Sequence, residues 1–148
     1  MKAISVQQPF AHWIVCGEKN FEYRTWNTEH RGDLLICSSA NPKIEGTISG
    51  HALCIVNVTD VIQVTKKNYQ ELELDEAPSR GEKLFAWKLD NIRIVKPFPV
   101  KGKLNFYYVD DELIDIIDDG SNTMTEDEAN ALVEKYILPL VYQPKKNK

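Results

Sequence analysis

Three charged residues that lie close together in the sequence could act on one ligand. They are Lys19, Glu22 and Arg24, in the segment GEKNFEYR at residues 17–24. An ammonium and a guanidinium group can bind a phosphate or the edge of a nucleobase, and a carboxylate can orient them or accept a ligand proton. Charges on an exposed strand are more often simply solvated, and that is the alternative interpretation of this segment.

A short helix is predicted directly before the charged segment. Pro9 suits its first turn, apolar residues recur at helical spacing over residues 9–16, and Gly17 is a natural stop. Trp13 lies on the apolar face of this helix, so we expect it to be in the core. Lys19 then stands where the helix is followed by a strand, and the intervening turn leaves the direction of its side chain open.

The strand after this turn is predicted to present the other two charges. Residues 20–26 alternate as a strand does, which places Glu22, Arg24 and Trp26 on one face. Alternate residues lie about 6.6 Å apart along a strand, so long side chains can meet above the backbone. From that face Trp26 could stack on a base, or it could fill the core or its rim.

Several further strands follow along the chain. They are predicted at residues 3–7, 34–38, 51–58, 84–95 and 104–109, and a short helix is predicted at 67–74. The alternation of the long strand is interrupted at Asp90-Asn91, which indicates a bend or bulge. Many short strands with few helices favour an α+β fold, built as a small mixed β-barrel with flanking helices.

The last quarter of the chain has a different character. Residues 110–148 contain 10 Asp+Glu and 4 Lys+Arg, a net charge of −6, whereas residues 1–109 carry a net charge of +2. A short acidic helix is predicted within 110–119, and an amphipathic helix over 125–140 follows a Thr-x-x-Glu capping box. We expect residues 110–148 to be an acidic helical extension that packs on domain 1–109 or on a partner, either an oligomer or another protein.

Composition and motifs exclude several classes of protein. A length of 148 residues, 43% hydrophobic residues and a net charge of −4 indicate one globular domain that is not a broadly cationic nucleic-acid binder. Cys16, Cys37 and Cys54 lie in apolar runs without a CxxC, which predicts buried reduced thiols and a cytoplasmic protein. No apolar run approaches the length that spans a bilayer, so we expect no membrane span. Scattered histidines and the lack of P-loop and GxGxxG motifs predict neither a metal nor a cofactor.

The charged segment also matches a family motif. Residues 17–24 fit the GxKxxExR signature of ASCH domains, the activating-signal-cointegrator homology domains of the PUA-like superfamily. The resemblance covers about residues 3–109. Other segments that resemble family elements are Gln8-Pro9-Phe10-Ala11, Arg24-Thr25-Trp26, Arg31-Gly32-Asp33-Leu34-Leu35-Ile36, Ala86-Trp87 and Pro99-Val100-Lys101-Gly102.

The resemblance implies a small barrel beside the first helix, with a cleft between them lined by Lys19, Glu22 and Arg24. It implies binding of RNA or of a modified nucleotide in that cleft. The remaining candidate ligand contacts are aromatic or basic residues of the chain, namely Trp26, Arg31, Trp87 and Lys101. Their alternative roles are core packing for the tryptophans and solvated turns or loops for the two cations.

The same resemblance leaves a catalytic alternative open. Some family members look like hydrolases, which remove acyl groups from N4-acylated cytidine or cleave RNA. Deacylating members use a Thr hydroxyl where this chain has Glu22, and a carboxylate is a poor replacement for that nucleophile. The chain also has Gln7 where many members have Arg, and Cys37-Ser38 where His-Ala is common.

Three hypotheses follow in order. The first is a binding module for RNA or a modified nucleotide. The second is an amidohydrolase acting on N-acylated nucleosides or bases, or a ribonuclease, with Lys19 and Glu22 as catalytic residues. The third is a protein-interaction module whose docking surface is the acidic extension.

Overall fold

Seven strands form one mixed sheet in the computed structural model, which describes residues 1–145; residues 146–148, the end of the predicted extension, lie outside the described part. The strands are β1 Lys2–Val6, β2 Phe21–Arg24, β3 Gly32–Ser38, β4 His51–Gln63, β5 Phe85–Pro99, β6 Tyr107–Tyr108 and β7 Ile116–Asp118. The helical segments are α1 Phe10–Val15, η1 Asp111–Leu113, α2 Glu126–Leu132, η2 Val133–Ile137 and η3 Leu138–Leu140.

The strand order is β2-β5-β4-β3-β1-β6, and β7 also pairs with β5. The pair β1–β3 is parallel and the other pairs are antiparallel. Within the described residues β2 and β6 are not paired with each other, so the sheet is open. These edge strands have four and two residues, which leaves few backbone groups for closure. The α+β fold is therefore confirmed, and the predicted closed barrel is not.

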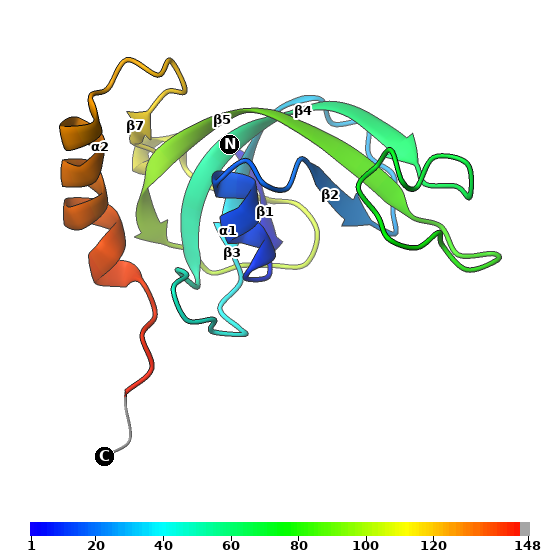
Figure 1. Cartoon of the computed structure of the whole chain (residues 1–148), viewed down its shortest axis with the longest axis horizontal. Coiled ribbons are helices and arrows are strands. Elements are labelled where there is room, and N and C mark those ends of the chain that lie inside the picture. The colour runs from blue at the N-terminus through cyan, green and yellow to red at the C-terminus, as the bar shows by residue number, and fades with distance from the viewer. Residues whose placement is uncertain (146–148) are drawn as a thin grey trace.

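Two long curved strands, β4 and β5, form the arch of the sheet (Figure 1). The predicted interruption at Asp90-Asn91 is present, because Asn91 has φ 54° and the register with β4 shifts there. The segment between the two strands forms turns instead of the helix predicted over 67–74. Glu73 has φ 64°, which ends helical geometry, and Leu72 is buried in a small cluster with Phe21.

Helix α1 lies against β3 and β4 (Figure 1). It has only six residues and buries Ala11 and Ile14 against core side chains of the sheet. The prediction for Trp13 is wrong, because a helix of this length turns few residues inward and Trp13 stays 40% exposed. The prediction of three buried thiols is also partly wrong. The thiols on β3 and β4 are buried, whereas Cys16 at the end of α1 is exposed.

The segment predicted as an acidic helix at 110–119 contains the short η1 turn and then β7. In η1 the Asp110 carboxylate accepts a hydrogen bond from the backbone N–H of Glu112, which caps the turn. Strand β2 pairs with the beginning of β5 and β7 with its later part, around Ile94 and Val95. Pairing with the free edge of β5 therefore replaces the local helix predicted for this segment. No sequence pattern within 110–119 indicates that this edge is free.

The amphipathic pattern over 125–140 does form helical turns, starting with the predicted cap. Thr125 Oγ1 accepts a hydrogen bond from the Glu128 N–H at 3.1 Å. The α-helix ends at Leu132 and continues as a wider π-turn and then a 3₁₀ turn. Pro139 lies in the 3₁₀ turn and has no N–H to donate to the preceding turn, so the α-helical hydrogen-bond pattern cannot continue through it. No helix within residues 1–145 has the length and apolar character that crossing a membrane requires.

Candidate functional site

A cavity of about 630 Å³ opens beside the start of α1, between β1, β2 and the loop before β6. Its volume lies in the range of about 300–1,000 Å³ typical of small-molecule sites. The three charged residues of the motif all line it, as do the polar residues Ser5, Gln7, Ser39, Lys103 and Asn105 and the larger apolar residues Phe10, Tyr23, Leu74 and Leu104.

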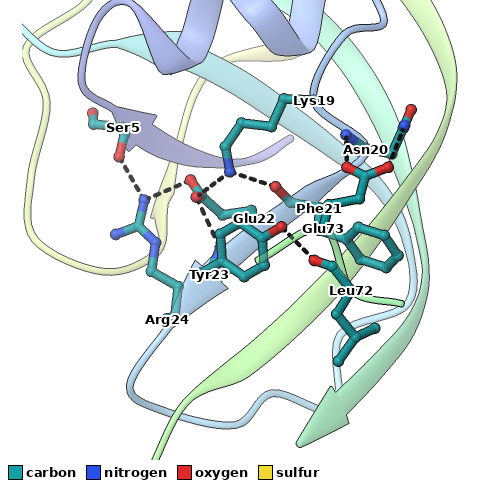
Figure 2. Close-up of polar contacts among 9 residues, drawn as sticks. All are labelled: Ser5, Lys19, Asn20, Phe21, Glu22, Tyr23, Arg24, Leu72 and Glu73. Atoms are coloured by element: carbon teal, nitrogen blue, oxygen red, sulfur yellow. Dashed lines mark hydrogen bonds and ion pairs between the residues drawn. The ribbon is translucent and has the colours of Figure 1, made fainter. Parts of the chain in front are cut away.

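Glu22 lies at the centre of the charged group (Figure 2). Its side chain is 8% exposed, and its Oε1 accepts hydrogen bonds from Lys19 Nζ at 3.5 Å and from the Tyr23 N–H at 3.0 Å. Its Oε2 accepts from Arg24 Nη2 at 3.2 Å. Both carboxylate oxygens are therefore engaged by the protein, and the negative charge is neutralised by two cations.

Lys19 is held from three sides. Its ammonium also donates to the carbonyl oxygen of Phe21, and it lies 4.4 Å from the centroid of the Tyr23 ring. Burial lowers the pKa of Lys19, and the nearby Glu22 carboxylate opposes this shift without reversing it. The ammonium group is thus fixed in place and loses its proton more readily than a lysine in water.

Arg24 connects two strands that are not neighbours in the sheet. Its Nη2 donates to the carbonyl oxygen of Ser5 in β1 at 2.8 Å, in addition to its bond to Glu22 (Figure 2). The Arg24 side chain is 24% exposed, and its Nε and Nη1 have no hydrogen-bond partner among residues 1–145. These two donors remain for single hydrogen bonds to a ligand, because both bidentate edges of the guanidinium include the engaged Nη2.

The loop after β4 forms one wall of the cavity through Leu74. Two contacts hold it against the motif. Tyr23 Oη donates to the carbonyl oxygen of Leu72 at 2.5 Å, and Asn20 Nδ2 donates to Glu73 Oε1 at 2.8 Å (Figure 2). Burial raises the pKa of Tyr23 to about 12, with a smaller contribution from the nearby carboxylates, so its hydroxyl remains a donor at neutral pH.

The loop before β6 forms the opposite wall and is fixed at Gly102. A Cβ at that position would lie 2.6 Å from Ser5 Oγ, so only glycine allows this approach. Ser5 Oγ is in turn 2.7 Å from the Tyr107 hydroxyl. Beyond Gly102 the chain carries Lys103 and Leu104 over the cavity, and Leu104 is 92% exposed.

The other four predicted contact residues do not line this cavity. Trp26 packs edge-to-face against Trp87 and Phe106, with ring centroids 4.8 and 5.1 Å apart, and Trp87 is fully buried. Strand β2 ends at Arg24, so the alternation that placed Trp26 beside it does not continue.

The two predicted cations also lie apart from the cavity. Arg31 Nη1 donates to the carbonyl oxygens of Thr28 and His30, both at 3.0 Å, and holds a surface turn. Lys101 is exposed at the start of the loop whose later residues reach the cavity.

Sequence reasoning missed several residues that line the cavity. Ser5 belongs to a strand that the sequence predicts, but nothing local indicates that this strand faces β2. Phe10 lies in a segment that resembles the family, and its helical spacing favoured a place in the core instead. Leu74 comes from a distant loop and gives no local signal. No group of three or more His, Cys, Asp or Glu within residues 1–145 is placed to hold a metal ion.

Comparisons with solved protein structures identify chains of similar fold. The crystal structure of an ASCH protein from Zymomonas mobilis aligns with a TM-score of 0.58 at 15% identity, covering 90% of this chain and 94% of that chain. Its tyrosine-to-phenylalanine and serine-to-alanine mutants each align with a TM-score of 0.56, at 14% and 15% identity, over 90% of this chain and 96% and 94% of theirs. At such identities the likeness shows the fold alone.

No curated protein sequence matches the chain. The model of the ASCH domain family matches residues 4–100, which is more than half of the chain and includes the whole charged motif. This chain therefore belongs to the ASCH domain family.

Proposed function

We propose that this ASCH domain binds RNA or a modified nucleotide in the cavity beside α1. The observation that carries the proposal is the convergence of Lys19, Glu22 and Arg24 on one cavity of nucleotide-compatible size. The wider family, which is PUA-like, supports RNA binding in general. The assignment of the ligand to these three residues is our own inference.

The charge of the cavity favours a ligand that carries phosphate. Lys19, Arg24 and Lys103 line it as cations, and Glu22 is the one carboxylate in its lining, although the whole chain has a net charge of −4. Because both oxygens of Glu22 are already engaged, its role is to orient the two cations. The Nε–H and Nη1–H groups of Arg24, which have no partner within residues 1–145, can each donate a single charge-assisted hydrogen bond to a phosphate oxygen.

The rest of the lining suits a nucleobase. Phe10 and Leu74 offer apolar surface, and a base can stack on the exposed phenylalanine ring. Hydroxyl and amide groups of Ser5, Gln7 and Asn105 offer donors and acceptors for a base edge or a ribose hydroxyl. Apolar walls with a few convergent polar groups are typical of small-molecule sites.

The test is calorimetric titration of nucleotides, modified nucleotides and short RNA into the wild type and three variants. We expect Lys103→Met to weaken binding of a phosphate-bearing ligand about tenfold, as loss of one charge-assisted hydrogen bond would do. We expect Arg24→Lys, which keeps the charge but loses the separate Nε and Nη1 donors and the bonds to Ser5 and Glu22, to weaken it as well. Lys101→Met is the matched control because Lys101 lies outside the cavity lining.

Two outcomes would contradict the proposal. One is that the folded wild type binds no member of the panel. The other is that Lys101→Met and Lys103→Met weaken binding equally, which would indicate diffuse electrostatic attraction without a defined site.

One observation favours hydrolysis as a second candidate function. Burial lowers the pKa of Lys19, and proton transfer at neutral pH requires such a shift in a lysine. Lys19 would then activate water or stabilise an oxyanion on an N-acylated base, with Glu22 orienting it. Incubation with N4-acylcytidines and with RNA, followed by chromatography, tests this function. No turnover by the folded wild type, or equal turnover by Lys19→Arg, would contradict it.

A further inference from the structure

Two exposed aromatic side chains on α1 form a pair, and one of them, Phe10, lines the cavity. Phe10 is 43% and Trp13 40% exposed, and their rings meet edge-to-face with centroids 5.3 Å apart. Phe10 lines the cavity, and Trp13 lies immediately beside it. The Trp13 carbonyl oxygen accepts the N–H of Lys19, another cavity residue, at 3.0 Å. The Trp13 ring therefore adjoins the cavity through its contact with Phe10 and is not itself part of the lining.

The opposite edge of the cavity also exposes apolar surface. Leu104 is 92% exposed and is held over the cavity by the loop that Gly102 fixes against β1. Lys103 precedes it and adds a positive charge to the same edge. Leu104 and the aromatic pair all remain exposed within residues 1–145. Large apolar groups exposed around one opening often mark a binding surface.

We propose that this edge is a stacking platform for single-stranded RNA, so that the nucleotide in the cavity is one unit of a strand. This inference rests on the proposed function. The base in the cavity would lie against Phe10, and the neighbouring base would stack on Trp13. Aromatic side chains hold successive bases of single strands in this way, and bases inside a duplex are already stacked and cannot reach them.

Charge complementarity favours RNA over a protein partner or a second copy of the chain. The aromatic pair adjoins a cavity lined by three cations, and the carboxylate of Glu22 within it is paired. The acidic excess of the chain lies in residues 110–148, and α2 and β7 of that segment are at the end of the sheet away from β2 (Figure 1). The three cations and one paired carboxylate of the lining therefore favour a polyanion over an acidic partner at this cavity.

The platform predicts a short footprint with weak salt dependence. Lys103 is an exposed cation at the edge, and Glu18, in the turn between α1 and β2, is an exposed acid that limits further backbone contacts. If the protein neutralises two phosphates of the bound RNA strand, the logarithm of the affinity should fall with the logarithm of salt concentration with a slope of about −1.4. A broadly cationic RNA binder would show a much steeper slope.

The experiment compares a uridine mononucleotide with di-, tri- and tetranucleotides by calorimetry. We expect affinity to rise by about 5- to 150-fold at the addition of one neighbouring base, which is the fold-change that one stacked base produces. Trp13→Ala should remove this rise and leave mononucleotide binding intact, and Trp13→Tyr should restore most of it. Tyr108→Ala is the matched control, because Tyr108 is 78% exposed and lies outside the cavity lining.

The outcomes separate this inference from the proposed function. If mononucleotide and tetranucleotide bind equally well, the platform is wrong and the nucleotide site stands. If the folded wild type binds no nucleotide of any length, the proposed function fails and the inference fails with it. If Trp13→Ala binds every ligand like the wild type, Trp13 does not stack on a base and the inference is overturned. The inference is also overturned if Trp13→Ala abolishes self-association measured by analytical ultracentrifugation, because the aromatic pair would then be a contact between copies of the chain.

Discussion

The two ends of the sheet differ in whether their charged side chains are buried or exposed. Beside β2, Lys19, Glu22 and Arg24 are largely withdrawn from water, and each has a charged partner. Beside β7, the segment 110–145 carries the acidic excess of the chain, and its helical turns contain no buried residue. The segment with the largest acidic excess is therefore not the candidate site; the site is where a few charges are buried.

The physical reason is the cost of removing charge from water. A buried ion is tolerated only with a partner and further hydrogen bonds, and a stable fold seldom needs such a group. Buried, paired charges in a cavity therefore indicate function, whereas exposed acids require no explanation. The end with β7 is instead held by apolar contacts, in which Ile137 and Val141 pack against the main core cluster.

The substitution Glu22→Ala tests this contrast most strongly. It would leave Lys19 and Arg24 without their shared carboxylate, and breaking a buried ion pair costs about 3–5 kcal/mol of unfolding free energy. Urea unfolding measures the loss. As a control, Asp127→Ala in the first turn of α2 removes an exposed carboxylate and should cost about 1 kcal/mol or less. Equal losses in the two variants would contradict the contrast.

Gly102→Ala tests the wall of the cavity and should have the next largest effect. The new Cβ would lie 2.6 Å from Ser5 Oγ, which is held by Tyr107, so the loop must shift. Overpacking of this kind costs about 1–3 kcal/mol. Because the loop carries Lys103, ligand affinity should fall as well. Thermal unfolding measures the loss of stability, and calorimetry measures the loss of affinity. Gly81→Ala is the comparison: Gly81 has φ +83° and no atom within 4 Å of the added Cβ, so this variant reports backbone strain without steric overlap.

Ile137→Ala tests how much the other end contributes. Ile137 is half-buried against the core cluster, so its truncation should cost about 1–2 kcal/mol, less than the 2–5 kcal/mol of a fully buried residue. Leu138 is 53% exposed, and Leu138→Ala should cost about 0.5 kcal/mol or less. Urea unfolding of both variants gives the comparison. If the two losses were equal, η2 would not be held by core packing.

The smallest expected effect is a dependence of stability on pH that belongs to Lys19. Burial lowers its pKa in the folded state below the ordinary 10.5, so in the window between these two values the unfolded state binds more protons. The free energy of unfolding should therefore rise with pH there, by at most about 1.4 kcal/mol per pH unit. The raised pKa of Tyr23 acts oppositely above pH 10.

Urea unfolding at a series of pH values between 7 and 10 measures this dependence. Lys19→Met should remove the rise. Lys135→Met, at an exposed position of η2, should leave it unchanged. A rise that persists in Lys19→Met would assign it to another group.

Local sequence patterns predicted most of the helices and strands, but they did not predict which of these elements pair or pack with one another. Gly17 ended the first helix as predicted, the bulge at Asp90-Asn91 is present, and Thr125 caps α2. The errors share a cause. Trp13 followed helical spacing but belongs to a helix too short to bury it, and residues 116–118 followed a helical pattern but pair with an edge of β5. Burial and pairing depend on partners that are distant in sequence.

The same distinction separates the motif from the cavity. Strand alternation by itself placed Glu22 and Arg24 on one face, whereas the turn left the direction of Lys19 open. The match to the family motif was needed to favour a shared cleft over solvated charges. Only the tertiary structure decided that Arg24 reaches the Ser5 carbonyl and that Gly102 carries Lys103 over the opening. Those contacts join segments 19 and 97 residues apart, and their closure is set by how the whole sheet folds, which no local pattern records.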